Sequence, residues 1–132
     1  IGRFLSEIEF LPDRILSSSA VRARTTLELA AEEGAWGDDA PTELTDELYD
    51  TTIENALALI QEQEDEFSRL LLVGHEPTWS RLAGALIGRA RLNISTATLI
   101  RIDFNAPRWR DVDFGDGELR WLVPAKLLRK SD

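Results

Sequence analysis

The sequence lacks cysteine entirely and contains a single histidine, His75, among its 132 residues. Without cysteine the chain can form no disulfide, supply no thiolate nucleophile and build no cysteine-based zinc site. One histidine is also a poor basis for a metal centre, because zinc usually takes three or four protein ligands. These two shortages give poor evidence for a metal site, and no metal ligand is predicted.

Methionine is absent as well, and the first residue is Ile1. A bulky residue in this position does not normally allow the removal of an initiator methionine, so we expect a further segment before Ile1. A targeting signal would belong to that segment, and the sequence from Ile1 onward therefore gives no indication of one.

The sequence also has no long hydrophobic run. Its longest candidate, residues 70–74, has the length of a strand, whereas a membrane-spanning helix needs about 18 or more apolar residues. A membrane span is therefore excluded, and we predict no membrane partner.

Basic residues are outnumbered, with 15 Lys and Arg against 24 Asp and Glu and a net charge of -9. An acidic domain repels a phosphate backbone, so we predict that nucleic acid is not a partner. The imbalance lies in residues 28–67, which contain 14 acidic and no basic residues. Apolar residues at helical spacing within this stretch indicate a folded segment with an acidic, solvated face.

The remaining composition, 43% hydrophobic and 30% charged, is that of a globular protein. A chain of this length buries roughly two thirds of its unfolded surface, which is enough for one core. The sequence contains no internal repeat, and no segment has the composition of a linker between domains. We therefore predict one domain over residues 1–132.

Helical and strand patterns alternate along the chain, with single Gly and Pro residues at their ends. The predicted helices span residues 2–9, 20–33, 52–64 and 77–87, and the predicted strands span residues 14–17, 70–73, 97–104 and 119–123. Residues 35–51, rich in Asp, Gly, Pro and Thr, are predicted to form a loop. The alternation favours an α/β domain with a mostly parallel sheet and helices on both faces.

In open α/β sheets, ligands bind beyond the carboxyl ends of the strands. The first such junction here is residues 15–26, where three serines follow a strand and offer hydroxyls to cap a helix. Arg22 and Arg24 come next, in the opening turns, where the helix dipole disfavours positive charge unless an anion is bound. The alternative is that both arginines are solvated surface residues.

The second junction is residues 70–80, where an apolar strand leads into Gly74, His75 and Pro77. Gly74 permits close backbone approach, Pro77 presets a first helical turn, and the free N–H groups there suit an oxyanion. His75 suits proton transfer or phosphate contact. The alternative is that His75 caps the helix or forms a hydrogen bond in the core.

The two junctions together predict a phosphoryl site. An arginine and a histidine on neighbouring strand ends can converge on one tetrahedral oxyanion, to which both donate. Beyond a nucleophile, phosphoryl transfer depends mainly on positioning and charge neutralisation.

Two segments resemble a known family. Residues 18–26, Ser-Ser-Ala-Val-Arg-Ala-Arg-Thr-Thr, resemble the Ser-Pro-x-x-Arg-Ala-x-x-Thr segment of the histidine phosphatase superfamily. Residues 72–77, Leu-Val-Gly-His-Glu-Pro, resemble its Val-Gly-His-x-Pro motif. The short chain is most similar to the SixA-type phosphohistidine phosphatases, which have stretches like residues 46–49 and 121–127. The resemblance covers nearly the whole chain and implies a phosphoglycerate mutase-like fold.

The sequence departs from this family at two points. Ser19 stands where the family has proline, which leaves Arg22 in register. The family's nucleophile lies in an Arg-His-Gly motif on a first strand, and these 132 residues contain no such motif. The resemblance therefore implies a domain truncated at its N-terminus, with the nucleophile in the segment expected before Ile1. The alternative is a remnant that has lost this strand.

The resemblance also implies roles for individual residues. The missing histidine would attack phosphorus, and water would then release the phosphohistidine intermediate, without any cofactor. Arg22 would hold the phosphoryl oxygens and His75 would donate to them as charge develops. Ser18 and the backbone N–H of Glu76 would add substrate contacts. The identity of the general acid stays open: it is Glu76, Glu47 or no residue at all.

The function implied by the resemblance is hydrolysis of phosphohistidine in a protein. The alternatives are a phosphatase or mutase acting on a sugar phosphate or another small phosphate, and an inactive phosphate-binding module. The predicted partner is accordingly a phosphorylated protein or a small phosphate, and we predict a cytoplasmic location. The sequence predicts no oligomeric state.

Overall fold

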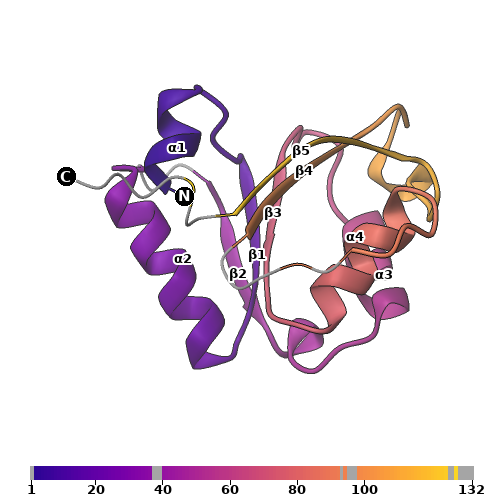
Figure 1. Cartoon of the computed structure of the whole chain (residues 1–132), viewed down its shortest axis with the longest axis horizontal. Helices are drawn as coiled ribbons and strands as arrows, with labels where there is room; N and C mark the ends of the chain where they lie inside the picture. The colour runs from indigo at the N-terminus through magenta and orange to yellow at the C-terminus, as the bar shows by residue number, and fades with distance from the viewer. Residues whose placement is uncertain (1, 37–39, 93, 95–97, 125–126, 128–132) are drawn as a thin grey trace. The chain divides into compact units, whose positions relative to one another are not determined.

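The computed structural model describes residues 2–36, 40–92, 94, 98–124 and 127 (Figure 1). The chain divides into two compact units. The first unit comprises Ile1–Asp50 and Glu66–Gly74, and the second comprises Thr51–Asp65 and His75–Asp132. Among the described helices, none combines the length and the apolar character that a membrane crossing requires.

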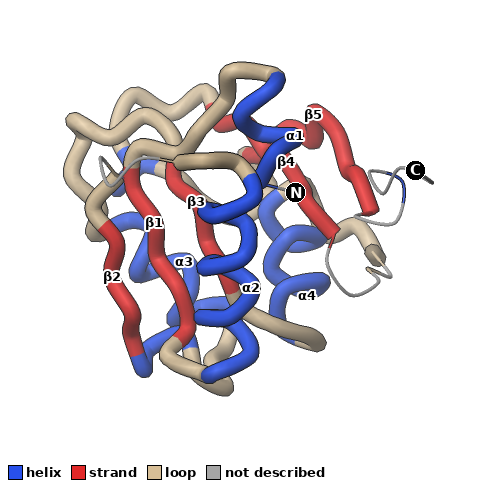
Figure 2. The backbone as a smooth tube through the Cα atoms, turned by 90° about the vertical axis from the view of Figure 1, so that its left-hand side faces the viewer, coloured by secondary structure: helices blue, strands red, loops and turns tan. Residues whose placement is uncertain are grey.

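The first unit contains a three-stranded parallel sheet. Its strands are β1 (Arg14–Ser18), β2 (Thr42–Thr45) and β3 (Leu70–Val73), in the order β2-β1-β3 (Figure 2). In the register, Ser17 of β1 pairs with Leu44 of β2 and with Val73 of β3. The carboxyl ends of all three strands therefore lie at the same edge of the sheet.

The central strand β1 is the most buried of the three. Its last four residues, from Ile15 to Ser18, are buried, and Leu16, Ser17 and Ser18 are each 0% exposed. The Ser17 hydroxyl donates to the carbonyl oxygen of Ser18 at 3.0 Å. The polar end of this strand is thus accommodated inside the unit because its hydroxyl is hydrogen-bonded.

Two helices, α1 (Gly2–Glu7) and α2 (Val21–Glu33), pack together in the first unit. α2 also contacts β1 and β3 and is drawn in front of the sheet in Figure 2. A Cβ atom on Gly2 would lie 1.6 Å from the carbonyl oxygen of Ala30, so glycine is required for this close approach. The indole of Trp36 donates to the carbonyl oxygen of Gly2 at 3.0 Å and closes the contact.

Asp13 joins the beginnings of β1 and β3. Its carboxylate accepts hydrogen bonds from the backbone N–H groups of Ser68, at 2.9 Å, and Arg69, at 2.8 Å. The Arg69 guanidinium lies 4.2 Å from the centre of the Phe10 ring, a cation–π geometry. These contacts fix the register of the two strands whose opposite ends carry the predicted site.

The second unit contains helices α3 (Ile53–Gln61) and α4 (Thr78–Leu86), which pack against each other. The hydroxyl oxygen of Thr52 caps α3 by accepting from the Asn55 N–H at 3.1 Å. The apolar residues that the two helices bury are Ala56, Leu57, Leu59, Ile60, Leu82, Ala83 and Leu86. The helical spacing of these residues is the signal that predicted both helices.

The second unit also contains an antiparallel pair of strands, β4 (Thr98–Phe104) and β5 (Gly117–Pro124). Their register shifts between Arg101 and Ile102, and Arg120 is the extra residue on the facing strand. The loop between the strands includes a short 3-10 helix, η2 (Trp109–Asp111). Two hydrogen bonds hold this loop to the region of α3. The Gln61 side-chain amide donates to the carbonyl oxygen of Val112, and the Trp109 N–H donates to the Asp65 carboxylate.

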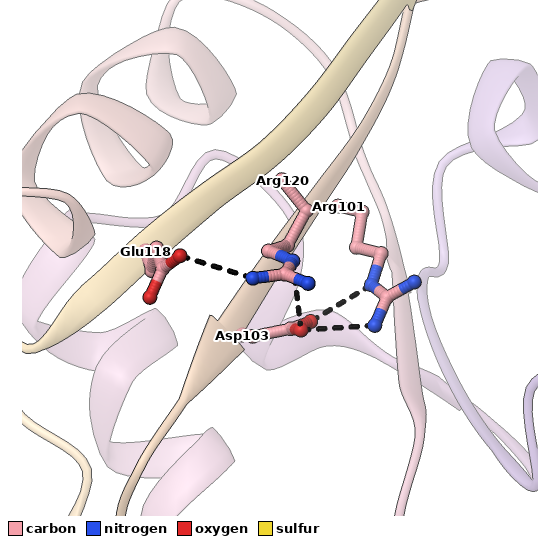
Figure 3. A network of polar contacts seen from close by, with 4 residues as sticks. All are labelled: Arg101, Asp103, Glu118 and Arg120. Atoms are coloured by element: carbon pink, nitrogen blue, oxygen red, sulfur yellow. Dashed lines mark hydrogen bonds and ion pairs between the residues drawn. The ribbon is translucent and has the colours of Figure 1, made fainter.

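A polar network crosses this pair of strands (Figure 3). The Asp103 carboxylate contacts Arg101 at 2.8 Å and Arg120 at 3.4 Å. Arg120 also contacts Glu118 at 3.0 Å. The hydrogen bond from Arg101 lowers the pKa of Asp103 and raises the pKa of Arg101.

The predicted α/β class and the mostly parallel sheet are confirmed, and each predicted helix and strand is present with small shifts at its ends. The predicted loop at residues 35–51 is wrong in part, because it contains β2 and a 3-10 helix, η1 (Asp46–Leu48). Ala97 of the predicted strand 97–104 and residues 125–126 of the family-like tail lie outside the described residues. That the chain is one domain, with helices on both faces of one sheet, stays a prediction.

Candidate functional site

The first part of the candidate site is the carboxyl edge of the parallel sheet. Ser18 is the last residue of β1 and pairs in register with Thr45, the last residue of β2. Both are buried, and β3 ends beside them at Val73. The backbone of the first unit thus places the end of β1 between two other strand ends, where α/β folds bind ligands.

Ser18 is held inside this edge. Its hydroxyl oxygen accepts from the backbone N–H of Ala20 at 3.2 Å. The N-cap of α2 is Ala20, whose side chain makes no capping hydrogen bond. The predicted capping of α2 by the serines is therefore wrong. The Ser18 hydroxyl binds the N–H of Ala20, which precedes the helix, and no serine caps an N–H of the helix itself. A contact between Ser18 and substrate stays a prediction.

The beginning of α2 suits an anion. Its first turn contains no acidic residue, and the first N–H groups of a helix have no partner within the helix. Arg22 lies in this first turn and is exposed. Arg24 is half-buried, and its Nε atom is buried without a hydrogen-bond partner among the described residues. The helix end and the exposed guanidinium of Arg22 both favour negative charge.

The turn after β2 is tied to the same edge. Thr45 caps η1, since its hydroxyl oxygen accepts from the Glu47 N–H at 3.1 Å. The Asp46 carboxylate accepts a hydrogen bond from the Ser19 hydroxyl. The sequence analysis did not single out Thr45, although a threonine before a short helix is a recognisable capping signal, and it included Asp46 only in the family-like stretch 46–49. Glu47, considered above as an acid, is exposed in this turn.

The second part of the candidate site follows β3. Gly74 and His75 are both half-buried, and Nδ1 of His75 is buried without a hydrogen-bond partner among the described residues. Buried polar nitrogens in proteins are nearly always hydrogen-bonded, and exceptions often coincide with functional groups. Whether His75 contacts a phosphate, caps the helix or forms a hydrogen bond in the core stays a prediction.

Glu76 and Pro77 connect His75 to α4. Pro77 is the N-cap of α4, and the peptide bond before it is cis. The Glu76 carboxylate accepts from the Ser80 backbone N–H at 2.9 Å and also from the Ser80 hydroxyl. One N–H group that we expected to be free for an oxyanion is therefore occupied by Glu76. Ser80 was not singled out from the sequence.

The predicted site residues fall in both units. Ser18 and Arg22 belong to the first unit, whereas His75 and Glu76 belong to the second. The convergence of Arg22 and His75 on one oxyanion therefore stays a prediction. Among the described residues, no cluster of three or more histidine, aspartate or glutamate side chains could hold a metal ion.

Solved structures share this fold. The protein histidine phosphatase SixA complexed with tungstate aligns with a TM-score of 0.79 and 20% identity, over 97% of this chain and 78% of that chain. A candidate phosphohistidine phosphatase SixA from Nakamurella multipartitia aligns with a TM-score of 0.73 and 24% identity, over 92% of this chain and 75% of that chain. Another such structure, from Agrobacterium tumefaciens, aligns with a TM-score of 0.59 and 34% identity, over 66% of this chain and 54% of that chain. The fold is that of the SixA-type histidine phosphatases, as the sequence motifs implied.

Two curated relatives are similar in sequence. The uncharacterized protein ML1117 of Mycobacterium leprae is 33% identical over 115 residues, which are 81% of this chain and 68% of that protein. The uncharacterized protein Rv1276c of Mycobacterium tuberculosis is 33% identical over 112 residues, which are 78% of this chain and 67% of that protein. No family model matches the chain. The chain belongs to the family of these mycobacterial proteins.

Proposed function

We propose that this protein is a phosphatase that hydrolyses phosphohistidine in a partner protein. The observation that carries the proposal is the position of the two motif residues on a SixA-type fold. Arg22 lies in the first turn of the helix after β1, and His75 follows β3, the strand paired with β1. The nucleophilic histidine is assigned to an Arg-His-Gly motif in a segment before Ile1.

The proposed reaction has two steps. The attacking histidine forms a phosphorus–nitrogen bond as that of the substrate breaks, and the proton it loses balances the proton gained by the leaving imidazole. Water then attacks the phosphoenzyme, which releases inorganic phosphate and restores the histidine. Arg22 provides paired donors to the phosphoryl oxygens, and His75 provides a further donor as their charge increases.

The charge of the first unit supports a protein substrate. The exposed side chains of η1 include Asp46 and Glu47, which directly follow Thr45, the residue paired with the end of β1. Carboxylates in this place repel free polyanions such as sugar bisphosphates and favour a phosphoryl group on a neutral or basic surface.

The test is a comparison of substrates with the full-length protein. We expect kcat/KM for a phosphohistidine-bearing protein to exceed that for a panel of sugar phosphates by about tenfold or more at matched ionic strength. A sugar phosphate that is turned over tenfold better would instead identify a metabolite phosphatase. Phosphate binding without turnover of any substrate would identify an inactive binding module.

The coding sequence upstream of Ile1 gives an independent check. We expect it to encode a strand that ends in Arg-His-Gly. Replacement of that histidine by asparagine in the full-length protein should abolish the phosphoenzyme, which labelling with a radioactive phosphoryl donor and an alkaline quench, in which phosphohistidine is stable, detects directly. An upstream sequence without this motif would contradict the assigned nucleophile.

A further inference from the structure

The start of α4 has an unusual arrangement of hydrogen-bond acceptors. Its N-cap, Pro77, has no polar side chain and makes no side-chain capping bond. Helices normally begin with a serine, threonine, aspartate or asparagine whose oxygen accepts a hydrogen bond from the third N–H. Here the preceding residue, Glu76, provides that oxygen, because it accepts from the Ser80 backbone N–H at 2.9 Å.

The Glu76 carboxylate is bound through both of its oxygens. One accepts from the Ser80 N–H, and the other accepts from the Ser80 hydroxyl. Ser80 is 9% exposed, and its hydroxyl oxygen also accepts from the backbone N–H of Ile94 at 3.4 Å. A carboxylate near a helix N-terminus is further favoured by the helix dipole. Both carboxylate oxygens of Glu76 thus accept hydrogen bonds from the first turn of α4, the helix that follows His75.

We propose that Glu76 is a positioning residue for His75 and that its carboxylate does not donate a proton to the leaving group. Glu76 directly follows His75 in the chain, and its link to Ser80 fixes the backbone from which the imidazole extends. An error of about 1 Å in the placement of a reacting group can reduce a rate by about 100-fold. This inference rests on the proposed function, in which His75 donates to the phosphoryl oxygens.

The two possible roles of Glu76 predict opposite results for Glu76→Gln. Glutamine keeps an oxygen that can accept from the Ser80 N–H, but it cannot act as an acid. A positioning role predicts kcat/KM within about threefold of the unmodified protein and an unchanged pH–rate profile. Glu76→Ala removes the acceptor, so it should reduce kcat by about tenfold or more.

A matched control separates positioning from loss of stability. Thr52→Ala removes a cap of the same kind from α3, in the same unit, where Thr52 accepts from the Asn55 N–H at 3.1 Å. It should lower the midpoint of thermal unfolding about as much as Glu76→Ala. With all variants assayed well below their midpoints, we expect only Glu76→Ala to reduce kcat.

The experiment uses the full-length protein and includes a measurement that does not depend on turnover. The ¹H and ¹⁵N resonances of the His75 ring should shift or broaden in Glu76→Ala and remain in place in Glu76→Gln and Thr52→Ala. Unchanged ring resonances in Glu76→Ala would overturn the positioning role whatever the activity. A Glu76→Gln enzyme that is as slow as Glu76→Ala and lacks the basic limb of its pH–rate profile would identify Glu76 as the general acid. An unmodified protein without phosphatase turnover would refute the proposed function alone.

Discussion

Arg22 and Arg24 lie two residues apart on α2 and have different surroundings. Arg22 is exposed, whereas Arg24 is half-buried with its Nε atom enclosed. Two steps along an α-helix rotate the direction of a side chain by about 200°, so the two arginines leave opposite faces of α2. The family motif favours Arg22 as the phosphoryl contact, and which of the two arginines makes that contact stays a prediction.

This difference leads to a prediction for kinetics. Arg22→Ala and His75→Ala should each reduce kcat/KM of the full-length protein by about 100-fold or more, because each removes a donor to developing charge. Arg24→Ala should cost much less. Steady-state kinetics with a phosphohistidine substrate measure the losses, and circular dichroism verifies the fold. Equal losses at Arg22 and Arg24 would show that the wrong arginine has been chosen.

At the scale of secondary-structure elements, the Asp103 carboxylate links the two strands in the polar network of β4 and β5. Asp103 contacts Arg101 beside it on β4 and Arg120 on β5 (Figure 3). Arg120 is the extra residue of the bulge, and Figure 3 shows its guanidinium next to Asp103. Such bulges redirect a side chain locally. The bulge and the ion pairs together join the two strands.

The pH dependence of this network follows from its charges. The hydrogen bond from Arg101 lowers the pKa of Asp103 from its ordinary value of 3.8. A carboxylate whose pKa is lowered by folding stabilises the folded state above the unfolded pKa, and this stabilisation is lost as the pH falls through the folded pKa. Because the Asp103 side chain is 38% exposed, its contribution should stay below about 1 kcal/mol.

We therefore expect Asp103→Asn to lower the free energy of unfolding at pH 7 and to have a diminishing effect as the pH falls below 3.8. Urea unfolding at a series of pH values measures the difference. Asp116→Asn, at an exposed loop position between the same strands, is the control. A loss of stability that is the same at pH 7 and in acid would contradict the ion-pair explanation.

The strand β2 shows what sequence patterns miss at this scale. Its first three residues, Thr42, Glu43 and Leu44, are exposed at the edge of the sheet, and only Thr45 is buried. Edge strands have no second neighbour to pack against, so their composition need not alternate between apolar and polar residues. Pairing with β1 is the tertiary interaction that makes this segment a strand.

At the scale of the whole molecule, the number of histidines limits what the 132-residue chain can do. The proposed reaction needs one histidine as nucleophile and another as donor, and the chain contains only His75. A single imidazole cannot form a bond to phosphorus and donate to its oxygens at the same time. If the proposed roles of Arg22 and His75 hold, the reaction therefore requires a second histidine besides His75.

We predict that the 132-residue chain by itself has no phosphatase turnover. The measurement is phosphate release from a generic phosphate ester and from a phosphohistidine protein, with the full-length protein as the positive control. A burst of phosphate from the short chain would contradict this prediction, and it would make His75 the nucleophile.

The sequence by itself determined the alternation of helices and strands and the two junctions that contain Arg22 and His75. These features depend on periodicity and on local motifs, which neighbouring residues specify. Only the tertiary structure decided that β2 joins the sheet, that Ser18 is enclosed at its edge and that Glu76 binds Ser80. Each of these depends on groups brought together by folding, and a side chain's choice between solvent, backbone and ligand is set by that packing.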